Sequence, residues 1–101
     1  MNLPTQAFKS VLTGEIQGGT TRKQLPNIVG GWVNIKAQSG NATNVYLGAS
    51  NVTVPDGTTD TTSGFTLDAG EETGWLPLTN LNMFWMITDA NGDDVTYIIL
   101  R

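Results

Sequence analysis

Short apolar runs follow one another along this chain, and where they alternate with polar residues they show the pattern of a strand buried on one face. The clearest run is WVNIKA at residues 32–37. Groups of turn-forming Gly, Pro, Asn and Asp separate such runs at intervals of about eight to twelve residues. No segment combines apolar residues at helical spacing with helix caps. The sequence therefore predicts an all-β fold, a small antiparallel β-sandwich or barrel.

The last apolar run, NMFWMITDANGDDVTYIIL at residues 82–100, predicts two strands joined by a tight turn. Both strands are apolar on both faces, whereas a two-layer sandwich exposes one face of each sheet to water. Three explanations stay open: ordinary core closed on both sides by other elements, coverage by the basic N-terminal segment, or a patch of Phe84, Met86, Ile98 and Leu100 that packs against another subunit. We favour subunit burial, with the N-terminal segment of a neighbour as a partial contributor. The residues expected in the core or at this interface are Trp32, Phe84, Trp85, Met86, Tyr97, Ile98 and Leu100.

Acidic residues surround the predicted turn, in the stretch DANGDD at residues 89–94. Asp89, Asn91 and Asp93 alternate as calcium ligands do in loop sites. The glycine and glutamate positions of the helical calcium loop do not match, however. Asn91 and Gly92 are the preferred central pair of a two-residue hairpin turn, because both tolerate positive φ. A turn is therefore favoured over a metal site, and we predict no cofactor.

Charge is distributed unevenly along the chain. The formal net charge is −4, with 14% charged residues. Lys9, Arg22 and Lys23 lie near the start, and from Gln24 to Leu100 the only positive residue is Lys36. Binding to nucleic acid is not expected, because phosphate neutralisation needs clustered Lys and Arg.

This charge division predicts an extended N-terminal arm over residues 1–24, with one short strand near residues 8–16, and a β-sandwich domain over residues 25–101. The arm is either a solvated leader or a segment that lies along a neighbouring subunit. The residues expected to contact a capsid or a subunit are Phe8, Lys9, Arg22 and Lys23.

Catalytic chemistry is not predicted. The chain has no His and no Cys, the commonest general base and the most reactive nucleophile. Acids that are adjacent in sequence, as at Glu71-Glu72, would point to opposite faces of a strand and not converge on a substrate. No apolar stretch has the length of a signal peptide or of a membrane span.

The stretch VPDGTTDTTSGF predicts an exposed loop over residues 55–64, because it has turn chemistry and no hydrophobic anchor up to Gly64. The segment FTLDAGEETGWLPL, which begins at Phe65, predicts another pair of strands. Trp75 is either a packed strand residue or a platform on which a sugar stacks, with this loop adapting to the ligand. A carbohydrate-binding module is therefore an alternative function.

The segments NVYLGASNVT, SGFTLDAGEE, LPLTNL, MFWMI and DANGDDVTYIIL follow one another from about Gly31 to the end of the chain. In this order they resemble small β-sandwich proteins of tailed-bacteriophage virions. The resemblance implies a structural virion protein of the decoration or cement type, in which an oligomer, often a trimer, binds the major capsid protein. It also implies a chain made in the host cytoplasm and located on the capsid surface. Related sandwiches serve in head fibres, tails and baseplates, which are further alternatives.

Overall fold

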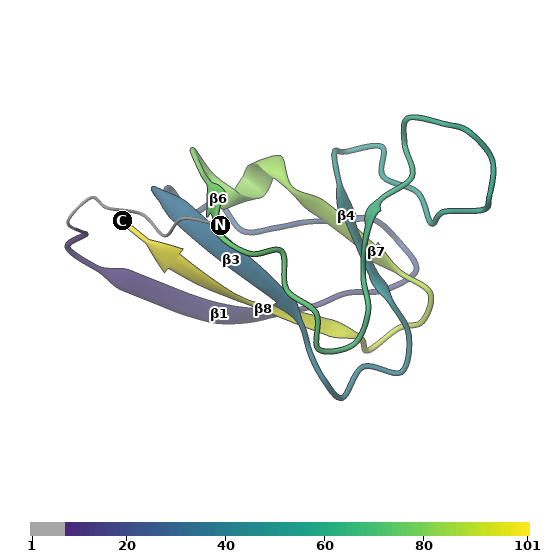
Figure 1. Ribbon diagram of the computed structural model, residues 1–101, viewed down its shortest axis with the longest axis horizontal. Coiled ribbons are helices and arrows are strands. Elements are labelled where there is room, and N and C mark those ends of the chain that lie inside the picture. The colour runs from purple at the N-terminus through teal and green to yellow at the C-terminus, as the bar shows by residue number, and fades with distance from the viewer. Residues whose placement is uncertain (1–7) are drawn as a thin grey trace.

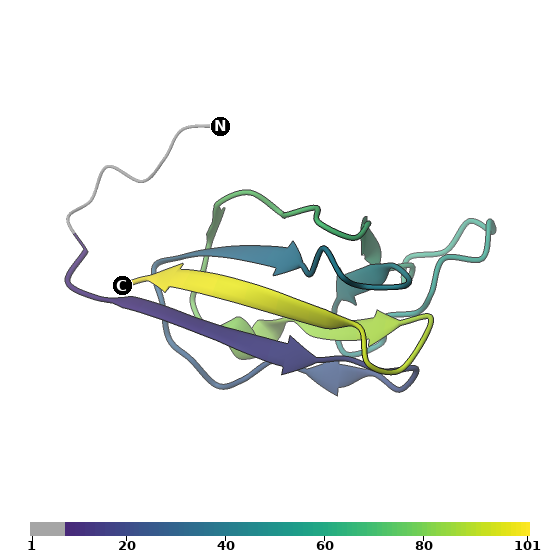
Figure 2. The ribbon, with the colours of Figure 1, turned by 90° about the horizontal axis from the view of Figure 1, so that it is seen from below.

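The computed structural model describes residues 8–101, which form eight strands and one short 3-10 helix. The strands form two four-stranded antiparallel sheets that pack as two layers (Figures 1 and 2). Sheet A has the strand order β1-β8-β3-β6, and sheet B has the order β2-β7-β4-β5. The prediction of a small antiparallel β-sandwich is confirmed. The elements are β1 (Val11–Gln17), β2 (Lys23–Gln24), β3 (Trp32–Ala37), β4 (Val45–Gly48), β5 (Phe65–Leu67), β6 (Leu76–Pro77), η1 (Leu81–Met83), β7 (Trp85–Thr88) and β8 (Asp94–Leu100).

The hydrophobic core lies between the two sheets. In β3, Val33 and Ile35 are fully buried, whereas Lys36 is exposed, because successive residues of a strand point to opposite faces. Val45 and Leu47 of β4 supply the core from sheet B in the same way. Burying each such side chain contributes about 1.5–3 kcal/mol, so alternation within the strands drives the two layers together.

β7 and β8 follow each other in the chain but belong to different sheets. β7 pairs with β2 and β4, whereas β8 pairs with β1 and β3. Residues 89–93 therefore cross from one layer to the other. Gly92 has a positive φ of 94°, and no non-glycine residue in the described range does. The predicted two-residue hairpin at Asn91-Gly92 is wrong, since that turn needs positive φ at both positions.

This crossing explains why the last two strands are apolar on both faces. Met86 of β7 and Ile99 of β8 reach the core from opposite layers, and both are 0% exposed. Ile98 and Leu100 alternate with Ile99 and lie on the outer face of sheet A, half-buried. Phe84 precedes β7. The set proposed from the sequence as one patch is thus divided between the core and different surfaces.

The described part of the predicted arm is built into the sheets. β1 pairs with β8 over seven residues, and β2 pairs with β7. Leu12 packs against the core and Ile16 is buried within it. A strand near residues 8–16 is therefore confirmed, but the chain up to residue 24 is not a separate extended arm, because its apolar residues complete the sandwich. Residues 1–7 of the predicted arm lie outside the described range.

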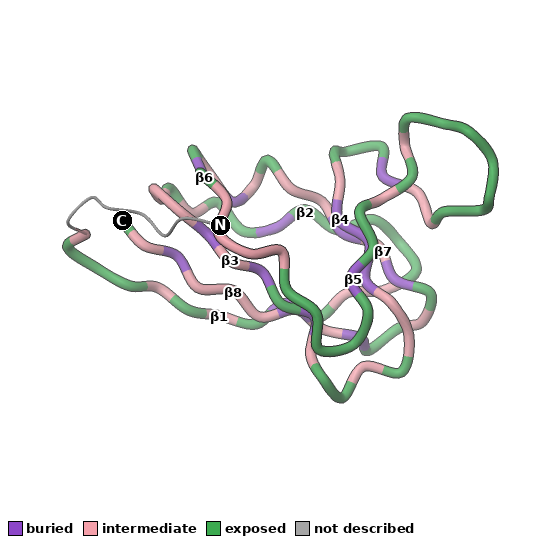
Figure 3. Tube along the Cα trace, viewed as in Figure 1, coloured by how far each residue is buried: buried purple, intermediate pink, exposed green. Residues whose placement is uncertain are grey.

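The segment that follows β4 folds back over the outer face of sheet B. Val52 is fully buried and Tyr46 nearly so. Gly64 permits this close approach, since a Cβ there would lie 2.6 Å from Tyr46 Cβ. The Gly64 N–H donates to the Thr53 carbonyl (2.9 Å) and closes the base of the loop. Beyond this base, residues 55–61 are exposed, as predicted (Figure 3).

Candidate functional site

An apolar cleft opens where the edges of the two sheets lie beside each other, and we call it the edge cleft. It has a volume of about 310 Å³. β5 at the edge of sheet B contributes to it, together with β6 at the edge of sheet A and η1. The side chains that form its apolar walls are Leu47, Ala49, Phe65, Leu76, Met83 and Phe84.

The edge cleft offers almost no polar chemistry. Gly48 and Thr73 complete its lining, so no charged residue contributes to it. The Thr73 hydroxyl donates to the Gly74 carbonyl (2.7 Å) and accepts from the Ile35 N–H (3.1 Å). Because this hydroxyl is already engaged, the cleft suits an apolar group and not a charged or polyhydroxylated one.

Two large apolar side chains are exposed at the edge cleft. Phe65 is 64% exposed and Met83 is 59% exposed. Phe65 lies on the same face of β5 as Leu67, which is almost completely buried. Phe65 differs because it borders the open cleft instead of the filled core. Such exposure beside an apolar hollow is typical of interaction surfaces.

A second apolar surface lies on the outer face of sheet A, and we call it the outer apolar row. The register aligns Val11, Leu100 and Trp32 across three neighbouring strands. The Phe8 ring lies beside this row, since a Cβ on Gly31 would be 3.1 Å from Phe8 Cε1. Val11 is 59% exposed, whereas Trp32, Leu100 and the adjacent Phe8 are half-buried.

The rest of that outer face is mostly polar, with Ile98 as an apolar residue among polar ones. Asn34 donates through its amide to the Glu72 carboxylate (3.0 Å), and Gln38 donates to the Glu15 carboxylate (3.1 Å). Lys36 shares a shallow trough of about 520 Å³ with Asn34, Glu72 and Glu15. The face is therefore divided into an apolar end and a polar end, and only the apolar end resembles a protein contact.

The structure does not bring the predicted basic contact residues into one surface. The Lys9 N–H donates to the Arg101 carbonyl (3.0 Å), next to the end of the chain. Arg22 donates through Nε to the Val52 carbonyl (2.6 Å), and Lys23 donates through Nζ to a carbonyl at the end of β1. Arg22 therefore connects the segment before β2 to the segment after β4 that covers the outer face of sheet B.

Of the other predicted interface residues, Trp32 and Leu100 belong to the outer apolar row, and Phe84 lines the edge cleft. Trp85 is half-buried in β7, and Tyr97 packs against the core. Sequence reasoning missed Phe65 and Met83. Both lie in segments predicted as strands, where apolar residues are expected to be buried. They are exposed because they lie where the edges of the two sheets come together.

The acidic segment at residues 89–94 has a structural role, because Asp93 connects two loops. Asp93 is only 4% exposed and accepts hydrogen bonds from the Ala42 and Thr43 N–H groups (3.0 Å each) and from the Thr43 hydroxyl. Burial by itself would raise the pKa of Asp93, but these hydrogen bonds outweigh it and hold the pKa below its usual value. Asp93 thus fixes the loop after β3 to the crossing between the sheets.

The Asp89 carboxylate and the main chain of Asp94 are held by other residues. Asp89 accepts from the Tyr46 hydroxyl (2.8 Å), and burial together with this bond raises the pKa of Tyr46. The Asp94 N–H donates to the side chain of Asn41 (2.9 Å). Over residues 8–101, no three carboxylates, His or Cys gather in a geometry that fits a metal ion.

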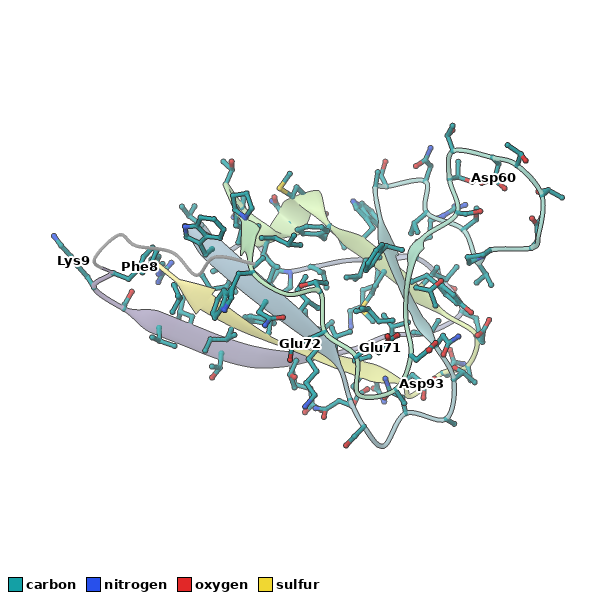
Figure 4. The ribbon with its side chains drawn as sticks, in the orientation of Figure 1. Phe8, Lys9, Asp60, Glu71, Glu72 and Asp93 are labelled. Carbon is teal, nitrogen blue, oxygen red and sulfur yellow. The ribbon has the colours of Figure 1, made fainter. Side chains whose placement is uncertain are left out.

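The features invoked for carbohydrate binding lie apart. Trp75 is half-buried directly before β6, whereas the loop at 55–64 is well separated from β6 along the long axis (Figure 1). Within the loop, Asp60 accepts from the N–H and hydroxyl groups of Thr62 and Ser63. Figure 4 shows Asp60 far from Lys9, at the opposite end of the molecule. The loop is therefore organised by its own short-range hydrogen bonds.

No helix within the described residues is long and apolar enough to span a membrane. Searches of family models, of curated proteins and of solved structures found nothing that matches this chain.

Proposed function

We propose that this protein is a non-enzymatic structural subunit of a bacteriophage virion, which binds the major capsid protein on the outer capsid surface and stabilises the shell as an oligomer, most simply a trimer. The observation that carries the assembly role is the edge cleft, with Phe65 and Met83 exposed beside an uncharged hollow. The virion location is proposed because the sequence resembles β-sandwich proteins of phage virions.

The free energies of burial and of association favour a contact that buries more than Phe65 and Met83. Burying Phe65 and Met83 contributes about 3–6 kcal/mol together. Association costs about 4–15 kcal/mol in lost freedom. These two side chains alone are therefore marginal, so the contact between copies also has to bury other apolar walls of the edge cleft, such as Leu76 and Phe84. The outer apolar row gives the molecule a second, separate place to bury apolar surface. In this proposal the edge cleft joins the copies to one another, and the outer apolar row contacts the capsid.

Replacing Phe65 with Ser is expected to dissociate the oligomer while the subunit stays folded, because Phe65 contributes to the cleft but little to the core. Multi-angle light scattering of the variant should give the mass of one chain, 10.8 kDa. Val29→Ser is the matched control, since Val29 is equally exposed, at 63%, but lies outside the cleft. Equal masses for the wild type and the Phe65 variant would contradict the proposed contact.

Capsid binding has a separate test. Trp32→Ser is expected to reduce co-sedimentation with purified phage shells and to leave the oligomer mass unchanged, because Trp32 lies in the outer apolar row and not in the cleft. Full occupancy by this variant would argue against a role of the row in capsid contact. Binding of the protein to a glycan array would favour the carbohydrate-binding alternative.

A further inference from the structure

We propose that Asn91 is a site of spontaneous self-modification, at which the side-chain amide becomes a carboxyl group through a cyclic imide formed with Gly92. The inference is independent of the proposed assembly role. It rests on the hydrogen bonding and the open surroundings of the crossing between β7 and β8.

The main-chain nitrogen that would attack is accessible. Gly92 is exposed, and a Cβ placed on it would meet only the Gln17 amide, at 3.8 Å. In the described part of the chain, the Gly92 N–H donates no hydrogen bond. Glycine carries no side chain to hinder approach to the neighbouring carbonyl carbon. The nitrogen is therefore free to lose its proton and to approach the Asn91 side chain.

The Asn91 amide is held in a way that suits this reaction. Its Oδ1 accepts from the Thr20 N–H (3.1 Å), which draws electron density from the carbonyl carbon. Its Nδ2 donates no hydrogen bond within the described range, so the leaving nitrogen is not restrained. Asn91 itself is exposed, which gives water access to the imide. Asparagine is a thermolabile residue, and here both reacting groups are open.

The reaction balances without an oxidant or a reductant. The Gly92 nitrogen loses its proton to a solvent base and forms a bond to Asn91 Cγ, and the Cγ–Nδ2 bond breaks to release ammonia. Water then opens the imide at either carbonyl, which gives an aspartyl or an isoaspartyl residue. The substrate is the protein itself and the co-reactant is water.

Asn41, in contrast, is restrained by the fold. Asn41 donates through Nδ2 to the Asp94 carbonyl (2.8 Å) and accepts through Oδ1 from the Asp94 N–H (2.9 Å). The N–H of the next residue, Ala42, is engaged by the Asp93 carboxylate. Both the amide and the attacking nitrogen are thus occupied at Asn41, and Ala42 adds a Cβ. We therefore expect Asn91 to convert before Asn41.

Conversion at Asn91 would alter the crossing between β7 and β8. It adds a negative charge to a crossing that already carries Asp89 and Asp93 and is followed directly by Asp94. The isoaspartyl product also lengthens the main chain between β7 and β8, beside the buried Asp93. Both changes are expected to lower the melting temperature of the modified chain.

The test is incubation of the folded protein at mildly alkaline pH, followed by peptide mapping with mass spectrometry and an isoaspartyl-specific methylation assay. We expect the peptide with Asn91 to convert first, while the peptide with Asn41 stays unchanged. Asn91→Gln should abolish this first conversion, because Gln must close a larger ring, whereas Asn41→Gln should leave it intact.

A denatured sample provides the second measurement. If the chain converts at Asn91 in denaturant but not when folded, the crossing protects the site and the inference is overturned. Faster conversion of Asn41 than of Asn91 in the folded protein would overturn it as well. The first comparison needs no variant, so a failure of Asn91→Gln to fold would not obscure the result.

Discussion

Replacing Asp93 with Ala is expected to lower the free energy of unfolding by about 3–5 kcal/mol. The variant leaves the N–H groups of Ala42 and Thr43 and the Thr43 hydroxyl without their buried acceptor. Each hydrogen bond to a charged group contributes about 1.5–3 kcal/mol, and contributions at one carboxylate add only in part. The loss also detaches the loop after β3 from the crossing between the sheets. Chemical denaturation followed by tryptophan fluorescence measures the change.

Asp56→Ala is the matched control for this prediction. Asp56 also accepts hydrogen bonds, from the N–H and the hydroxyl of Thr58, but it is exposed in the loop outside the sheets. We expect little change in stability from this variant. Equal losses from the two substitutions would show that burial of Asp93 is not what makes its hydrogen bonds valuable.

The stability that Asp93 provides should depend on pH. Its hydrogen bonds hold its pKa in the folded state below the usual value, in spite of burial, which acts in the opposite direction. A lowered pKa stabilises the fold above the unfolded-state pKa of about 3.9, and this contribution is lost as the pH falls through the folded-state pKa. The difference in the free energy of unfolding between the wild type and Asp93→Ala should therefore be largest at neutral pH and become smaller in acid. A difference that stays constant down to strongly acidic pH would contradict this origin.

Replacing Met86 with Ala is expected to cost about 2–5 kcal/mol of stability, because it leaves a cavity in the core. Met86 is 0% exposed and pairs between β2 and β4 in sheet B. Met83→Ala is a control of the same residue type, since Met83 is 59% exposed. This control should change stability little and weaken assembly instead. Denaturation midpoints and light scattering of both variants separate the two roles, and a larger loss of stability from Met83→Ala would refute the division.

The fold class could be predicted from the sequence because alternation is local. Each strand shows which of its faces is apolar, as in the segment at 32–37, and the inner faces must meet. Pairing partners are not local, and this is where sequence reasoning failed. Asn91-Gly92 has the chemistry of a hairpin turn, yet the strands on either side find partners far away in the chain.

The candidate site was less accessible to sequence reasoning. Phe65 and Met83 lie in segments where any apolar residue is expected to be buried, and their exposure depends on where the edges of two different sheets end. The basic residues near the start predict an arm, but the apolar residues between them, Leu12 and Ile16, place that segment in sheet A. The spacing of residues along the chain indicates neither the exposure of Phe65 and Met83 nor the pairing of the N-terminal segment within the sheet.

The central claim is that the edge cleft is a contact between copies of this chain. Its most direct test replaces Phe65 with the photoreactive analogue p-benzoylphenylalanine and maps the cross-links formed in solution. The account predicts a cross-linked pair of chains whose attachment points fall on residues that line the edge cleft of the second copy, such as Leu76 and Phe84. Cross-links confined to single chains at every protein concentration would contradict it.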